Sequence, residues 1–331
     1  MSFSRDMLVI DPEAVTRQIV TAIKEHVLVT LRRKGGVFGL SGGVDSSVVA
    51  ALAVRALGAD RVLALLMPER DCSPAALELG RLVAERFGVP FTVEDIGPTL
   101  EAFGCYARQE EAIRTVFPDY GPGWRCKLTM PSVVDSDRIS VTSLTVRSPD
   151  GAERTSRLSP EAYRKLVAAT NFKQRTRKTF EYYHADRLGY AVLGTPNRLE
   201  YDQGFFVKQG DGAADMKPIA HLYKTQVYAL ARYLGVPEEV CSRPPTTDTF
   251  SMEQTQEEFF FALPYDRMDL CLHAFDHGVP PDEVGAALGL SPVQIERVYR
   301  DIQAKRRTTR YLRTPPLFVE PVAEVEPETR R

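Results

Sequence analysis

The sequence predicts an α/β fold in which a doubly wound, mostly parallel sheet is flanked by helices. Short apolar runs alternate with helical patterns over the first hundred residues, as in consecutive strand–helix units. The first run leads into Leu40-Ser41-Gly42-Gly43-Val44-Asp45-Ser46-Ser47, and an alanine- and valine-rich helical pattern follows. Another apolar run, at 190–194, enters a dense block of polar residues. Such a sheet is Rossmann-like, and ligands bind beyond the carboxyl ends of its strands.

The elements follow in chain order. Apolar positions spaced by four predict a helix over 13–33, and Ser73-Pro74 supplies an N-cap with proline at the first helical position. Further strands and helices are predicted from apolar runs and helical stripes. The strands are 37–40, 61–67, 91–96 and 190–194, and the helices after the loop are 48–57, 75–87, 99–113, 160–187 and 223–234.

The pattern changes between about 105 and 160. Strict alternation over Arg138–Val146, the turn Ser148-Pro149-Asp150-Gly151 and a second polar run predict a β-hairpin outside the parallel sheet. It is either a lid or subunit-contact element or a plain surface insertion. We therefore divide the chain into an α/β domain (1–104 and 160–265), an insertion (105–159), a small C-terminal helical region (266–314) and a disordered tail (315–331).

Composition excludes several classes of protein. The 331 residues are 44% hydrophobic and 26% charged, with a net charge of −2, so no basic field favours nucleic acid. Five widely spaced cysteines form no CxxC pair, which argues against a disulfide frame or a zinc site. With no apolar signal region and no run that could cross a bilayer, we expect no membrane partner and a cytoplasmic location.

The loop Ser41–Ser47 is predicted to hold an anion. A helix N-terminus offers unpaired N–H groups and a positive dipole end, and Gly42 and Gly43 allow close approach of the backbone. Asp45 adds a carboxylate for a phosphate-bound metal. The spacing is not GxxxxGK[ST], so this is no Walker loop. SGGxDS resembles the pyrophosphate loop of the ATP pyrophosphatases, whereas the simpler alternative is a glycine turn capped by serines.

The block from Thr195 to Lys224 holds a candidate second half of the site. Thr195 follows a strand and should lie at the ligand-binding edge of the sheet. Glu200, expected in a loop, would join Asp45 as an oxygen ligand of Mg²⁺. Lys208 and Lys224 would neutralise a pyrophosphate leaving group. Taken one at a time, such residues more often have structural roles, and it is the joint pattern that predicts a site.

That joint pattern resembles the ammonia-dependent NAD synthetase family over most of residues 13–315, apart from much of the insertion. Several motifs occur in one order with family-like spacing. They are SGGVDSS (41–47), NFKQR (171–175), GT-x-N-R-x-E (194–200), GFFVK (204–208), GDGAAD (210–215), LYKTQ (222–226) and PTTD (245–248).

The resemblance implies roles for individual residues. Ser41, Gly42, Gly43, Val44, Asp45, Ser46 and Ser47 would bind ATP, the co-substrate, and Thr195, Lys224 and Thr246 match further ATP contacts. Asp45 and Glu200 would hold Mg²⁺. Arg175, Lys208 and Asp215 match contacts to deamido-NAD, and Lys305 matches the C-terminal part of that site. Asp45, Lys208 and Lys224 are the predicted catalytic residues. The family is usually a homodimer.

The implied reaction needs neither a serine nucleophile nor a histidine base. Attack of a carboxylate on the α-phosphate of ATP gives an acyl-adenylate and releases pyrophosphate, and ammonia then displaces AMP to form an amide. The protein aligns the reactants and neutralises charge. Ammonia would be free or come from a separate glutaminase.

Three departures from the family concern the acyl-acceptor side. Ala304 precedes Lys305 where the family commonly has histidine, Pro196 follows Thr195, and the insertion precedes the NFKQR helix. One alternative is therefore a diverged amide synthetase that activates a different carboxylate. Another is a tRNA-modifying ATP pyrophosphatase, which predicts a basic surface that the composition lacks.

Overall fold

The computed structural model describes residues 3–130, 142–246, 249–261, 263–320 and 322. Within these ranges four strands form a parallel sheet in the order β3–β2–β1–β7. The strands are β1 (Gly36–Gly39), β2 (Val62–Leu66), β3 (Phe91–Val93) and β7 (Ala191–Val192). Phe38 lies opposite Ala64, and Val37 lies opposite Val192. The prediction of a doubly wound, mostly parallel α/β sheet is confirmed.

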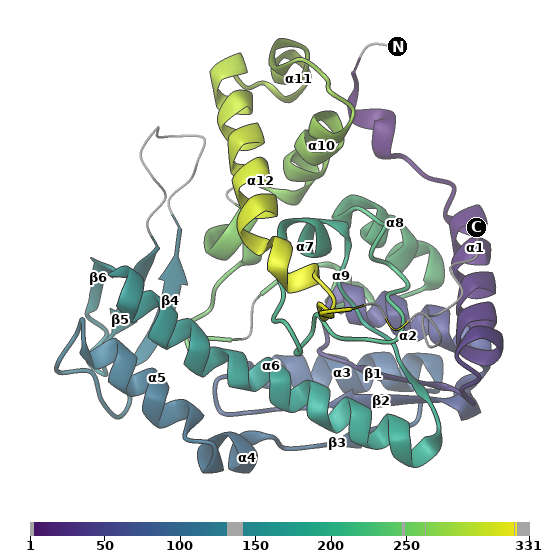
Figure 1. Ribbon diagram of the computed structural model, residues 1–331, viewed down its shortest axis with the longest axis horizontal. Helices are drawn as coiled ribbons and strands as arrows, with labels where there is room; N and C mark the ends of the chain where they lie inside the picture. Colours follow the sequence, from purple (N-terminus) through teal and green to yellow (C-terminus); the bar gives the residue numbers. More distant parts are fainter. Residues whose placement is uncertain (1–2, 131–141, 247–248, 262, 321, 323–331) are drawn as a thin grey trace.

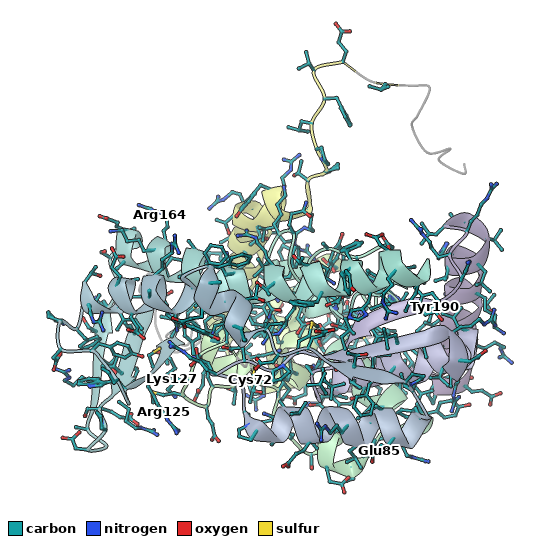
Figure 2. All side chains as sticks on the ribbon, turned by 90° about the horizontal axis from the view of Figure 1, so that it is seen from below. Cys72, Glu85, Arg125, Lys127, Arg164 and Tyr190 are labelled. Atoms are coloured by element: carbon teal, nitrogen blue, oxygen red, sulfur yellow. The ribbon has the colours of Figure 1, made fainter. Side chains whose placement is uncertain are left out.

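Helices cover both faces of this sheet, as Figure 1 shows. Alternate side chains point to opposite faces of a strand, so Phe38 packs with one layer of helices and Val37 with the other. The first layer contains α1 (Pro12–Lys24), α2 (Val44–Leu57), α3 (Pro74–Phe87) and α8 (Lys224–Leu234), and the second contains the long α6 (Pro160–Leu188). In Figure 2, Glu85 on α3 and Arg164 on α6 mark these two opposite sides.

A second sheet lies beside the end of α6 (Figure 1). In the described part of the insertion, β4 (Arg125–Thr129), β5 (Ser143–Arg147) and β6 (Glu153–Arg157) form an antiparallel sheet in that order. Its buried face packs against Leu166 of α6. The predicted hairpin is confirmed as β5–β6, and the structure adds β4. Residues 138–141 of the predicted strand lie outside the described residues.

The C-terminal part of the chain is helical. α10 (Tyr265–Asp276), α11 (Pro281–Leu288) and α12 (Pro292–Arg313) share one apolar cluster. Of the tail, residues 315–320 and 322 are described and contain no helix or strand, while 321 and 323–331, which we predicted to be disordered, lie outside the described residues. None of the described helices is both long and apolar enough to cross a membrane.

The single helix predicted over 99–113 is wrong. The segment forms α4 (Gly97–Ala102) and α5 (Cys105–Arg114), because Gly104 between them has a φ of +64° and ends the first helix. The other helical segments of the described residues are short. They are η1 (Arg5–Leu8), η2 (Glu25–Thr30), η3 (Ala59–Arg61), α7 (Arg198–Gln203), α9 (Glu238–Cys241) and η4 (Glu257–Phe261).

Candidate active site

The loop between β1 and α2 has the backbone of a phosphate-binding turn. Gly42 has a φ of +75°, and a Cβ atom there would lie 2.6 Å from the carbonyl oxygen of Ala76, so only glycine fits. Gly43 is the N-cap of α2. The hydroxyls of Ser46 and Ser47 donate to the Gly43 carbonyl oxygen at 3.0 and 2.8 Å. Because the first N–H groups of a helix have no intrahelical acceptor, this turn presents backbone donors to an anion.

Asp45, Glu200 and Lys224 come together beside this loop. The Lys224 ammonium forms an ion pair with Asp45 Oδ2. Asn197 Nδ2 donates to Asp45 Oδ1 at 3.1 Å, and the Asn197 backbone N–H donates to Glu200 Oε2 at 3.1 Å. Gln256 Nε2 donates to Glu200 Oε1 at 3.3 Å. Every oxygen of the two carboxylates therefore accepts a hydrogen bond, which fixes both groups.

Lys224 is held in place through its backbone. It is the first residue of α8, and its N–H and that of Thr225 donate to the two carboxylate oxygens of Asp269 at 3.2 and 2.7 Å. Asp269 belongs to α10 and is completely buried. The C-terminal helices thus anchor the start of α8, and the Lys224 side chain is buried where it meets Asp45.

Burial and neighbouring charge set the ionisation of this cluster. Burial and then repulsion from Asp45 raise the pKa of Glu200 to about 8. Burial disfavours the charged form of Lys224, but attraction by Asp45 and Glu200 outweighs it and raises the pKa of that ammonium. A second cation next to the two carboxylates would favour the ionised form of Glu200.

The carboxylates of Asp45 and Glu200 fit a cation that takes most of its ligands from water and substrate rather than from the protein. Among the described residues, no group of three or more His, Cys, Asp or Glu side chains could hold a metal ion by itself. Mg²⁺ is characteristically bound by one or two carboxylates together with waters and substrate phosphates. Asp45 and Glu200, next to a phosphate-binding turn, match that donor set.

The cluster lines a cavity of about 1040 Å³ at the carboxyl ends of β1, β2 and β7. Its walls also include parts of α6, β4, α12 and the segment around Thr246. Cys72, which is labelled in Figure 2, is partly buried and also lines it. The predicted residues that line it are Ser41, Gly42, Gly43, Val44, Asp45, Ser46, Thr195, Glu200, Lys224, Thr246 and Lys305.

Lys305 reaches this cavity from α12. Its ammonium forms an ion pair with Asp301 at 2.7 Å and donates to the Phe260 carbonyl oxygen at 2.6 Å. Burial lowers the pKa of Lys305, although the charge of Asp301 opposes this shift. Lys305 and Asp301 therefore place an ion pair on the cavity wall formed by α12.

Four predicted residues are not part of the cavity lining. Ser47 is buried behind the loop, with its hydroxyl on the Gly43 carbonyl. Arg175 Nε donates to the Lys208 carbonyl oxygen at 3.2 Å. Lys208 Nζ in turn donates to the carbonyl oxygens of Tyr311 and Thr314, at the end of α12.

Asp215 is the fourth of these residues. Its carboxylate accepts the Val192 N–H at 2.8 Å and the Tyr182 hydroxyl at 3.3 Å. Both bonds tie the loop after β7 to the sheet and to α6. Within this single chain, Arg175, Lys208 and Asp215 thus make contacts with protein groups rather than with the cavity.

The structure adds residues that the sequence analysis missed. Asn197 and Gln256 bind the two carboxylates, as described above. Asp211 also lines the cavity, and burial raises the pKa of its carboxyl although the Val207 N–H donates to it at 2.7 Å. The prediction that Glu200 lies in a loop is wrong, because it is the third residue of α7 and forms a capping box with Asn197. The spacing N-x-x-E from Asn197 to Glu200 is typical of a capping box, so the sequence could have predicted that this helix starts there.

α6 contributes a further ion pair to the cavity wall. Lys178 Nζ lies 2.6 Å from Glu181 Oε2, and both side chains are buried where they line the cavity. No sequence pattern marked this pair, since the residues lie inside a basic helical stretch.

A glycine turn at a helix N-terminus, a buried lysine and two carboxylates at the carboxyl edge of a parallel sheet are typical of the α/β proteins that bind nucleotides. Comparison with known proteins agrees with this class. The family model described as NAD synthase matches residues 15–119 and 132–316. The chain belongs to the NAD synthase family, as the resemblance of its motifs predicted.

Two relatives that match this chain along almost their whole length are named NH(3)-dependent NAD(+) synthetase. The NH(3)-dependent NAD(+) synthetase of Rhizobium meliloti is 60% identical over 324 residues, covering 98% of this chain and 97% of the relative. That of Mesorhizobium japonicum is 61% identical over 318 residues, covering 96% and 100%. Among solved structures, the NH3-dependent NAD synthetase of Campylobacter jejuni superposes with a TM-score of 0.62 at 23% identity, covering 94% of this chain and all of that one. This last likeness concerns the fold.

Proposed function

We propose that this chain joins ammonia to the carboxylate of deamido-NAD while ATP is cleaved to AMP and pyrophosphate, which makes it a ligase that forms a C–N bond. The observation that carries the proposal is the Asp45–Lys224–Glu200 cluster, buried beside the Ser41–Ser47 turn in one large cavity. The names of relatives that are about 60% identical support the same activity.

In the proposed site the turn after β1 binds the phosphates of ATP. Its glycines and the first N–H groups of α2 supply close backbone donors, and Thr195 and Thr246 line the same cavity. Ser47 supports the turn from behind through its bond to Gly43. Lys224 would neutralise the pyrophosphate leaving group, and the position of its ammonium beside Asp45, next to the turn, supports this role.

We assign Mg²⁺ to Asp45 and Glu200. When bound, this ion would neutralise charge on the phosphates. The chain's own contribution is to hold the two carboxylates rigidly, through Asn197 and Gln256, and to align the acceptor carboxylate with the α-phosphorus. Bond formation to that phosphorus breaks the bond between the α- and β-phosphates. Ammonia then attacks the acyl carbon, AMP leaves, and one proton is released.

The acceptor side is assigned to Lys305, Arg175, Lys208 and Asp215. Lys305 lies on the cavity wall, whereas the other three lie outside it. We therefore propose a homodimer in which a second copy helps to complete the site for the dinucleotide. For Lys208 to contact substrate, its ammonium must leave the carbonyl oxygens at the end of α12.

The ammonia is either free or supplied by a separate glutaminase, and we place the reaction in the cytoplasm.

The division of the chain at 105–159 and 266–314 is proposed to separate the ATP-binding part from the elements that enclose the second substrate. β4 and α12, one from each of these segments, both contribute to the cavity wall.

The test is an assay with ATP, Mg²⁺, ammonium and deamido-NAD, in which NAD, AMP and pyrophosphate are quantified together. We expect the three products in equal amounts. Asp45→Asn should abolish pyrophosphate release, whereas Asp119→Asn, which removes an exposed carboxylate paired with Arg154, should leave it unchanged. Pyrophosphate release with another acid, but not with deamido-NAD, would overturn the proposed substrate.

A further inference from the structure

Asn197 makes more contacts than the start of a helix requires. It is completely buried between the end of β7 and α7. Its Oδ1 accepts the Glu200 N–H at 3.2 Å, and its backbone N–H donates to Glu200 Oε2 at 3.1 Å. Its Nδ2 donates to Asp45 Oδ1 at 3.1 Å, across 152 residues of sequence. One residue therefore touches both carboxylates of the site.

Helix capping explains only part of this arrangement. A cap needs a side-chain oxygen, and serine, aspartate and asparagine supply it about equally well. An amide is needed only because a donor must face Asp45 while an acceptor faces the Glu200 N–H. This pair of partners also fixes the amide orientation, since the flipped group would set an oxygen against a carboxylate.

The bond across to Asp45 joins two elements that are otherwise separate in sequence. Asp45 lies in the first turn of α2, and Glu200 lies in the first turn of α7. Lys224 binds Asp45, and Gln256 binds Glu200. Asn197 contacts both groups, so it links the position of the Asp45 carboxylate to that of the Glu200 carboxylate.

We propose that Asn197 is a positioning residue that sets the separation and orientation of the Asp45 and Glu200 carboxylates for a shared divalent cation. The inference rests on the proposed metal role of these two carboxylates. It goes beyond that role by assigning the geometry of the pair to one amide group. Groups that orient metal ligands typically change metal affinity by roughly 10- to 100-fold when they are removed.

The substitution Asn197→Ser separates positioning from capping. The serine oxygen still accepts the Glu200 N–H, and the backbone N–H still donates to Glu200 Oε2. The shorter side chain no longer supplies the second group that reaches Asp45. Asp45 then keeps its bond to Lys224 and loses the bond that fixes its other oxygen. The lost hydrogen bond to the Asp45 carboxylate should lower the urea midpoint of this variant, while the retained cap keeps it folded.

The experiment measures the Mn²⁺ affinity of the full-length chain by EPR in the absence of nucleotide, because a nucleoside triphosphate would bind Mn²⁺ by itself. Asn197→Ser should weaken Mn²⁺ binding by roughly 10- to 100-fold. Ser291→Ala is the matched control, because it removes the same kind of capping box at the start of α12. It should lower the urea midpoint and leave the Mn²⁺ affinity unchanged.

The outcomes separate the inference from the function on which it rests. If Asp45→Asn abolishes Mn²⁺ binding while Asn197→Ser binds it as tightly as the wild type, Asn197 is only a helix cap and the inference is overturned. If Asp45→Asn leaves Mn²⁺ affinity unchanged, the metal assignment itself fails and the inference falls with it. Loss of affinity in both variants, with a cooperative urea transition for Asn197→Ser and unchanged affinity for Ser291→Ala, supports the positioning role.

Discussion

Replacing Lys224 with methionine gives a direct test of the charge balance in the cluster. The Lys224 side chain is 1% exposed and that of Asp45 is 16% exposed, so the pair is largely shielded from water. Removing one partner of a buried ion pair typically costs about 3–5 kcal/mol. We expect about 3 kcal/mol here, because Asp45 keeps some contact with water and its hydrogen bond from Asn197. Methionine keeps the unbranched shape and most of the length of the side chain, so most of the loss reflects the charge.

Mg²⁺ should restore part of this stability if Asp45 and Glu200 bind it. An ion that binds only the folded chain, at 100 times its Kd, adds about 2.7 kcal/mol. Urea unfolding of Lys224→Met with and without Mg²⁺ measures both effects. The double variant Asp45→Asn/Lys224→Met should be close to the wild type in stability and lose the response to Mg²⁺. Our reasoning is refuted if Lys224→Met unfolds at the urea concentration of the wild type, or if the double variant responds to Mg²⁺ equally strongly.

Two further predictions concern the loop and the anchor of α8. Gly42→Ala should cost about 1–2 kcal/mol or more through its positive φ, whereas Gly43→Ala should be nearly neutral, because its φ is −89° and the added Cβ would meet only Ser41 Oγ at 3.4 Å; urea midpoints compare them. Burial raises the pKa of Asp269 to about 6, against about 3.9 in the unfolded chain, so its contribution to stability is present below pH 4 and lost as the pH rises through 6. The stability of the wild type relative to Asp269→Asn should therefore fall by about 2 kcal/mol between pH 4 and pH 7, and an equal difference at both pH values would contradict this.

The sheet and its phosphate-binding turn could be predicted because their signals are local. Apolar runs, the glycine pair at 42–43 and the proline-capped helices each specify one element within a few residues. The break at Gly104 was missed because an isolated glycine is often tolerated inside a helix. β4 was missed for another reason: it is stabilised by pairing with β5, which follows about eighteen residues later, after 131–141.

The sequence predicted which residues belong to the site better than it predicted how they contact one another. The motifs named Asp45, Glu200 and Lys224, and the structure brings all three together. They also named Arg175, Lys208 and Asp215, which lie outside the cavity of the single chain. Motif order carries no information about which contacts need a second chain or a bound substrate. Asn197 and Gln256 escaped notice because an amide acquires its role only from the carboxylate it faces.

The ion pair between Lys224 and Asp45 couples two events in the proposed reaction. The Lys224 ammonium has three N–H donors, so a phosphate would share it with Asp45. A largely buried carboxylate whose partner is shared is stabilised when another cation binds beside it. Glu200, with a pKa of about 8, is mostly protonated at neutral pH and contributes its charge only when such a cation is present. Without substrate the charges of Asp45 and Lys224 cancel, so the cluster is close to neutral. When a divalent cation binds, Glu200 becomes ionised and both carboxylates carry charge. Nucleotide and divalent cation should consequently bind together more tightly than either binds alone.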